Sequence, residues 1–444
     1  MNLTCMPVCK TGGTDLSLTK EQQLHHAVLQ IFFNPSAEQS RRLSLLSEHE
    51  WNRLLHWLDI SGLALYFLDR LAELQWQGLL PAHVQARLQQ NLADNATRMH
   101  SMIAESGALH EEFEQAGLSH ALLKGISLWP SALPKPELRS QLDVDFLVAE
   151  ADIAPARRIL EQRGYYLHAV SGRSWEFKTH AVPSGSLKDL YKDLPFRAVE
   201  LHAEIPSKDK PSLLASRELR MIGNQRLPVL SPLDLFLGQG LHLYKHVCSE
   251  FYRASHLLEF QRHILSRRGN DAFWHEVRLR AAEYPLAGWG LGVVTLLLSQ
   301  LMGECAPESF LTWTVDRLPP AARLWVEMYG WRCALNAVPG TKLFLFLQAE
   351  LEKQGVPARR SVQRSLMPVR LPKLIVRGTA GEGLQRRIHR YRIQIRFLSL
   401  RLRFHVVEGL RYARELPRWK FRLKQYIAST SATVSRANKG MTIL

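Results

Sequence analysis

The chain has 444 residues, of which 46% are hydrophobic and 22% are charged. This length favours roughly two to four domains, and this composition excludes a chain that is mostly disordered. The formal net charge of +16 favours an anionic partner. The segment from Arg370 to Leu444 holds 18 Lys and Arg against 3 Asp and Glu, whereas the preceding 369 residues hold 39 against 38. The C-terminal fifth therefore carries nearly all of the charge.

The cysteines and the apolar runs predict a cytoplasmic protein without a transmembrane span. The five cysteines are few, odd in number and widely spaced, which is typical of a reduced protein. No signal-peptide core occurs near the N-terminus. The uncharged run 284–303 has about the length of a membrane span, but its glycines, its proline and its polar residues favour a buried core helix.

In chain order, the patterns predict a mixed core between helical regions. The expected parts are a loose tail (1–20), a helical N-terminal region (21–107), a core of strands and helices (108–206), a helical domain (207–355) and a basic C-terminal extension (356–444). In the core, "SHALLKG", "LDVDFLV", "YYLHAV" and "FRAVELHAEI" are typical of strands, and "DIAPARRILEQRG" of a helix closed by Gly164. After Pro206 only helices are expected, beginning with an N-cap at Ser231. The fold class is therefore α+β, with a small mixed sheet.

Two carboxylates stand inside the apolar strand "LDVDFLV". Because side chains alternate along a strand, Asp143 and Asp145 point the same way and repel each other unless a cation lies between them. Glu200 in "VELHAEI" shares a face with His202 and could join them from a neighbouring strand. Hard oxygen ligands at this spacing favour Mg²⁺ or Mn²⁺. The alternatives are that the aspartates cap a turn and that Glu200 pairs with a surface lysine.

The stretch "LLKGIS" upstream predicts a phosphate-binding turn. Gly125 allows close backbone approach, and Ser127 with the following amides could cradle a phosphate. Lys124 and Arg139 supply cations for a triphosphate, although salt bridges to the aspartates would explain them as well. Three carboxylates around divalent ions beside such a turn are typical of phosphoryl chemistry.

"LLKG", "LRSQLDVDFLV" and "VELH", in this order, resemble the uncharacterised nucleotidyltransferase family of the DNA polymerase beta superfamily. The resemblance covers roughly residues 25 to 345 and includes "LSPLDLFLGQGLHLYKH". It implies transfer of a nucleoside monophosphate from an NTP to an acceptor hydroxyl, with release of pyrophosphate. The residues that it implies are Gly125 and Ser127 for phosphates, and Asp143, Asp145 and Glu200 for metals and catalysis. Three features depart from the superfamily pattern: the Gly-Ile-Ser turn, the long gap to Asp143, and Glu as third acid.

Two histidines are expected next to this site. His202 is expected behind the metal ligands as a hydrogen-bonding partner, with a direct role as the alternative. His242 matches a histidine typical of the family and shares a helix face with Lys245 and His246. These residues could line the nucleotide pocket, or His242 could be a core histidine with satisfied hydrogen bonds.

The sequence leaves the acceptor and two rival functions open. One rival is a non-catalytic module with a nucleotidyltransferase-like fold, and the other is a toxin–antitoxin-type enzyme that adenylylates a protein. In the basic extension, apolar and aromatic residues alternate with arginine and lysine. This mixture favours binding to nucleic acid or to an anionic membrane surface through residues 356–444.

Overall fold

The computed structural model describes residues 18–180, 186–205, 211–249, 252–336, 340–355, 361–367 and 383–440. Most of the expected tail and of the expected linker before the basic helix lies outside these ranges, as do Cys5 and Cys9. Within them, seven strands form one mixed sheet in the order β3-β4-β5-β2-β1-β7-β6. The strands are β1 His120–Leu122, β2 Val144–Ala149, β3 Tyr165–Ser171, β4 Ser174–Thr179, β5 Ala198–Glu204, β6 Glu218–Ile222 and β7 Gln225–Val229. The α+β class with helical flanks is confirmed.

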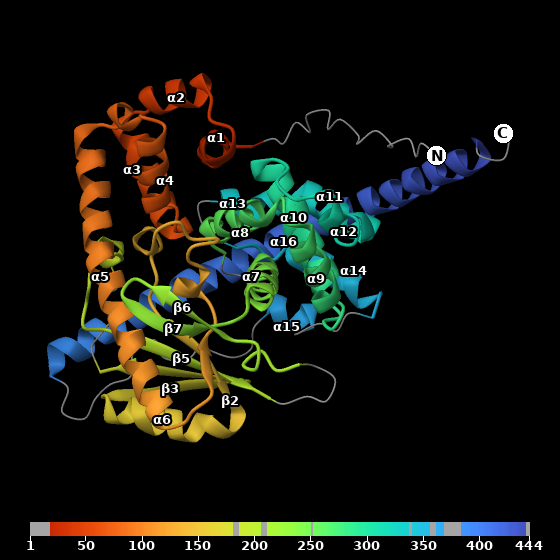
Figure 1. Cartoon of the computed structure of the whole chain (residues 1–444). Helices are drawn as coiled ribbons and strands as arrows, with labels where there is room; N and C mark the ends of the chain where they lie inside the picture. Colours follow the sequence, from red (N-terminus) through yellow and green to blue (C-terminus); the bar gives the residue numbers. More distant parts are fainter. Residues whose placement is uncertain are drawn as a thin grey trace.

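Helices precede and follow the sheet (Figure 1). Before it come α1 Lys20–Phe33, α2 Ala37–Ser44, α3 Glu48–Ser61, α4 Ala64–Glu73 and α5 Ala82–Gln115, and α6 Ile153–Gln162 connects β2 to β3. After it come α7 Pro232–Val247, α8 Ala254–Arg267, α9 Asp271–Ala281, α10 Ala287–Met302, α11 Glu308–Leu311, α12 Pro320–Trp325, α13 Trp331–Leu335, α14 Phe344–Glu352, α15 Val362–Leu366 and α16 Leu384–Gly440.

The two faces of the central strands have different surroundings. Side chains on one face, including those of Val144, Phe146 and Leu201, form an apolar core with residues of α5 and α6. Because side chains alternate along a strand, Asp145 and Glu200 lie on the opposite face, which looks toward the helical regions. Burial of the apolar side chains on one face therefore sets the register of β2 and β5 that brings the acids together on the other face.

Three strands, β4, β6 and β7, were not predicted from the sequence. The patterns predicted only helices after Pro206, but β6 and β7 form a hairpin there and complete the sheet beside β1. Its turn is Gly223-Asn224, with Gly223 at a φ of +60°, a residue pair that typically joins two strands. β4 was missed as well. Charged residues in β4, β6 and β7 conceal the apolar alternation of these strands. The predicted boundary at residue 206 falls between strands of one sheet.

Two other helical predictions are confirmed and refined. α10 lies in the core within the run 284–303, as expected, with Leu291, Leu297 and Leu298 fully buried. None of the helices in the described ranges is both long and apolar enough to cross a membrane. α7 begins directly after Ser231, whose hydroxyl accepts a hydrogen bond from the Asp234 amide. The boundary expected at residue 107 lies inside α5, a helix of 34 residues.

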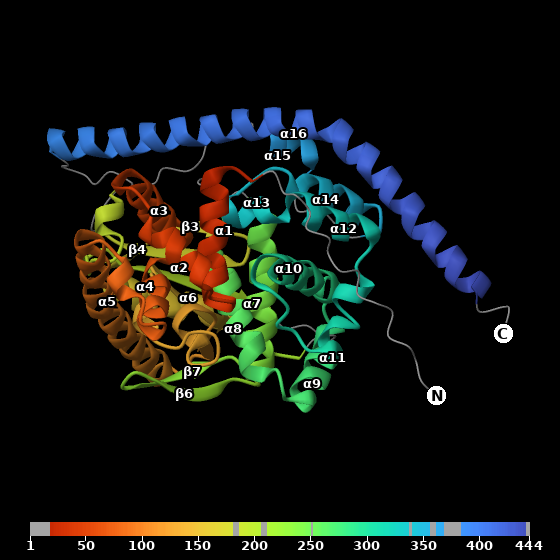
Figure 2. The same cartoon turned by 90° about the horizontal axis from the view of Figure 1, so that it is seen from above.

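The basic extension contains a helix of 57 residues, α16, which runs along the body and continues past it (Figure 2). Its acids attach it to the helical region. Glu408 accepts hydrogen bonds from the Thr341 hydroxyl at 2.8 Å and the Lys342 amide at 3.1 Å. Glu415 accepts one from the Tyr329 hydroxyl at 3.1 Å. Trp419 is buried beside them, and losing such a contact costs on the order of 3 kcal/mol.

Candidate active site

The sequence-predicted acids converge at the centre of the sheet. β2 and β5 are parallel neighbours, and Asp145 pairs directly with Glu200. Asp143 precedes β2 by one residue, on the same side as Asp145. Paired residues on adjacent strands project to the same face, so the three carboxylates form one cluster. Two neighbouring strands, β2 and β5, therefore bring these acids together.

Asp145 is the most buried member, with a relative exposure of 1%. A buried carboxylate requires compensating positive charge and hydrogen bonds. Lys124 Nζ lies 3.0 Å from Asp145 Oδ1, and His202 Nε2 lies 3.1 Å from the same oxygen. His202 Nε2 also lies 3.5 Å from Glu200 Oε2. His202 therefore bridges two of the carboxylates.

The protonation of these groups follows from burial and from their neighbours. Burial raises the pKa of Asp143 to about 6, and the neighbouring Asp145 adds to the shift. Burial would also raise the pKa of Glu200, but hydrogen bonds from His202 and Ser174 hold it well below its usual value. Burial would lower the pKa of His202, yet its bonds to Asp145 and Glu200 raise it to about 9. At neutral pH His202 is therefore a cation between two carboxylates.

The turn after β1 brings Lys124 to the acids. Gly125 has a φ of +73°, and a Cβ placed there would lie 2.4 Å from the amide group of Gln141. The positive φ therefore favours glycine at this position, and a larger residue would also have to displace the Gln141 amide group. Lys124 and Gly125 line a cleft together with Asp143 and Asp145, whereas Glu200 and His202 are not among its lining residues. Ser127 is fully buried in the following 3₁₀ turn, and it is not among the residues that line this cleft.

Arg139 has a partner other than the aspartates. Its guanidinium forms an ion pair with Glu259 of α8, which also accepts a hydrogen bond from the Tyr66 hydroxyl at 2.9 Å. Arg139 nevertheless lines the cleft, and so does Arg253, which precedes α8 and donates to the Ser140 carbonyl oxygen at 3.3 Å. Arg139 and Arg253 therefore line the same cleft as Asp143.

The cleft has a volume of about 470 Å³, which suits a ligand of nucleotide size. His242 lines it, as the sequence analysis allowed, together with His246 of α7 and His256 of α8. His256 and Arg253 escaped the sequence analysis. Both stand at the start of α8, a helix distant in sequence from the acids, and no motif spacing marks them.

The donor set fits the expected divalent ion. Ligand atoms of Asp145, Glu200 and His202 lie within 4.8 Å of one another. The Lys124 ammonium and the His202 imidazolium already neutralise these carboxylates, so a metal ion would have to replace at least one of these cations. Carboxylate oxygens are the ligands that Mg²⁺ and Mn²⁺ prefer. Asp145 and Glu200 could hold the ion in that case, with Asp143 on the same side of the sheet.

One protein-family model matches the part of the chain that contains these residues. The model of an uncharacterised nucleotidyltransferase family matches residues 47–303, which is more than half of the chain and includes all of the site residues above. The chain belongs to this uncharacterised nucleotidyltransferase family. The match extends from α3 through the sheet to the end of α10, so the family region includes helices on both sides of the sheet, and α16 lies outside it.

Other comparisons add little to the family assignment. No curated protein matches the chain. Among solved structures, it is similar to an antigenic nucleotidyltransferase-like protein from Paracoccidioides brasiliensis. The identity is 14% and the TM-score is 0.27, and the match covers 46% of this chain and 94% of that one.

The pKa of His202 predicts how stability depends on pH. A histidine whose pKa rises from 6.5 to about 9 on folding stabilises the protein fully below pH 6.5. That contribution is lost as the pH rises through 9, by up to roughly 3 kcal/mol. We expect His202→Gln to remove this slope between pH 7 and 9.5. Urea unfolding of both proteins in EDTA measures it, and equal slopes would contradict the assigned charge.

Proposed function

We propose that this chain transfers a nucleoside monophosphate from an NTP to an acceptor hydroxyl and releases pyrophosphate, with Mg²⁺ or Mn²⁺ as cofactor. The observation that carries the proposal is the register of Asp145 with Glu200, with Asp143 on the same side. The cleft beside them presents Lys124 and Arg139 and accommodates a ligand of nucleotide size. Membership of the nucleotidyltransferase family supports this reading.

Each residue of the site has its own part in the proposed transfer. The bound metal would supply positive charge for the triphosphate and for the attacking oxygen. Gly125 leaves room for the backbone of the turn to approach the phosphates, and Lys124 and Arg139 contribute positive charge beside them. The acceptor oxygen forms a new bond to the α-phosphorus while the bond to pyrophosphate breaks. The proton of the hydroxyl passes to Asp145, because the hydrogen bonds that hold the pKa of Glu200 well below its usual value make Glu200 a poor base.

One observation favours the alternative of a non-catalytic binding module. Asp145 is already neutralised by Lys124 and His202 at 3.0 and 3.1 Å. If neither cation moves, the carboxylates are structural and the cleft binds its ligand without metal. The two functions therefore predict different results for a variant that lacks one of these carboxylates.

We expect Asp143→Asn to lower the transfer of labelled α-phosphate from NTP to acceptors in a heat-treated cell extract by roughly 1,000-fold or more. Losing several kcal/mol of charge stabilisation corresponds to such a factor. The thermal midpoint should stay equal or rise, because the buried Asp143 carboxylate loses its desolvation cost.

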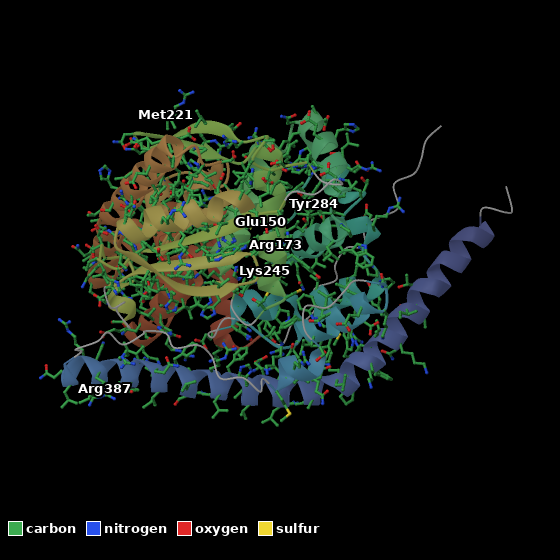
Figure 3. The ribbon with its side chains drawn as sticks, turned by 90° about the horizontal axis from the view of Figure 1, so that it is seen from below. Glu150, Arg173, Met221, Lys245, Tyr284 and Arg387 are labelled. Carbon is green, nitrogen blue, oxygen red and sulfur yellow. The ribbon has the colours of Figure 1, made fainter. Side chains whose placement is uncertain are left out.

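The matched control is Glu150→Gln, an exposed acid just beyond the other end of β2 (Figure 3). It removes one charge and should leave transfer unchanged. Undiminished transfer in Asp143→Asn would refute the catalytic assignment.

We further propose that α16 places the protein on an anionic membrane surface. Leu384, Ile388, Tyr391, Ile395, Leu402 and Val406 are all exposed and recur at spacings of four, three and seven. They therefore form one apolar stripe on the helix, which the sequence analysis had not resolved. Arginines accompany the stripe, and Arg387 lies near the N-terminal end of α16 (Figure 3). Exposed apolar residues among arginines favour a lipid interface over nucleic acid, which needs the charge alone.

We expect the protein to sediment with phosphatidylcholine vesicles that contain phosphatidylserine, and not with pure phosphatidylcholine. The triple variant Ile388→Asp/Ile395→Asp/Leu402→Asp should lose this binding, since three charges enter the apolar stripe. Leu219→Asp/Met221→Asp is the control, because both residues are exposed on β6, remote from α16 in sequence. Binding to duplex DNA or RNA in the absence of vesicle binding would contradict the proposal.

A further inference from the structure

Three histidines lie together on the helical wall of the cleft. His242 and His246 stand one turn apart on α7, and His256 stands in the first turn of α8. One ligand atom from each imidazole lies within 4.8 Å of the other two. His242 Nε2 and His246 Nε2 are 2.9 Å apart. All three rings line the cleft that also contains Asp143 and Asp145.

The state of these rings suits metal coordination. Burial lowers the pKa of His242 and of His256, and the positive charge of Lys124 and Arg139, respectively, adds to the effect. Both rings are therefore neutral at pH 7, which is the form that binds metals. His256 Nδ1 is buried and has no hydrogen-bond partner among the described residues. A buried ring nitrogen normally has a hydrogen-bond partner or a bound ion.

We propose that His242, His246 and His256 bind a transition-metal dication, best Zn²⁺, at a site separate from the carboxylates. Imidazole ligands favour Zn²⁺, Co²⁺ or Ni²⁺ over Mg²⁺. Three protein ligands leave a fourth position open, as in zinc sites that bind a water or a substrate. Because the three imidazoles line the cleft, a ligand at that position would come from the cleft. The proposal does not depend on nucleotidyl transfer.

The charges around the site define the fourth ligand. Lys124, Arg139 and Arg253 line the same cleft, and the positive charges of Arg139 and Arg253 reach His256. A further dication among them is favoured when an anion completes its coordination. The fourth ligand is therefore an anionic oxygen, such as that of a phosphate or a carboxylate.

A second histidine cluster is a weaker candidate. His110 Nδ1 lies 2.9 Å from His120 Nε2, and Glu114 completes the group. Glu114 is exposed, and none of the three lines the cleft. Only two imidazoles are present there, so this cluster is the weaker zinc ligand set and a useful comparison.

The test uses tag-free, full-length protein freed of metal with a chelator. Zn²⁺ is titrated in competition with a chromogenic zinc indicator, and Co²⁺ is then followed by its visible absorption, which reports tetrahedral coordination. Wild type should bind one Zn²⁺ in the cleft. His246→Ala and His256→Gln should each weaken it by more than roughly 100-fold, because losses outside the ligand set already cost 10–100-fold.

The controls separate this site from the others. His275→Ala changes an exposed histidine of α9 and should leave the affinity unaltered. Asp143→Asn/Asp145→Asn should keep Zn²⁺ binding within a few-fold even where NTP turnover is lost. Thermal unfolding of the metal-free variants verifies that they fold. Full affinity in both His246→Ala and His256→Gln would overturn the proposal, as would loss of the site in His110→Ala alone.

Discussion

The architecture depends on one buried carboxylate, that of Asp145 at the centre of the sheet. Removing a charge from water costs several kcal/mol unless opposite charges replace the lost hydration. Lys124 and His202 provide them, at 3.0 and 3.1 Å from one oxygen. This requirement ties together the turn after β1, the strand β2 and the strand β5. A metal ion bound here, as we propose, would replace at least one of these two cations.

The sheet supplies the acids, but the helical regions supply the opposite wall. Glu259 of α8 accepts both from Arg139 and from the Tyr66 hydroxyl of α4. This buried network therefore joins the N-terminal helices, the loop before β2 and the helices after the sheet. Arg139 and the histidines of α7 and α8 line the same cleft as Asp143 and Asp145, so residues from all three parts contribute to the site.

Local alternation along a strand allowed some of the site residues to be predicted from the sequence, whereas residues placed by long-range packing could not be predicted. Asp143, Asp145 and Glu200 follow from period-two alternation, since the apolar partners fix which way each acid points. His202 was expected near the site, but its bridging position depends on the register of β5. His256 and Arg253 could not be foreseen, because long-range packing of α8 brings them to the cleft. β6 and β7 carried a Gly-Asn turn signal that the charged residues of both strands obscured.

We propose that these carboxylates create a metal-dependent nucleotide site. The most direct measurement is isothermal titration of a non-hydrolysable NTP analogue, with and without Mg²⁺, into wild type and into Asp143→Asn/Asp145→Asn. We expect binding that requires Mg²⁺ in wild type and is absent in the double variant. Binding of equal strength in both proteins, or binding indifferent to Mg²⁺, would contradict it and assign the cleft to a metal-free binding module.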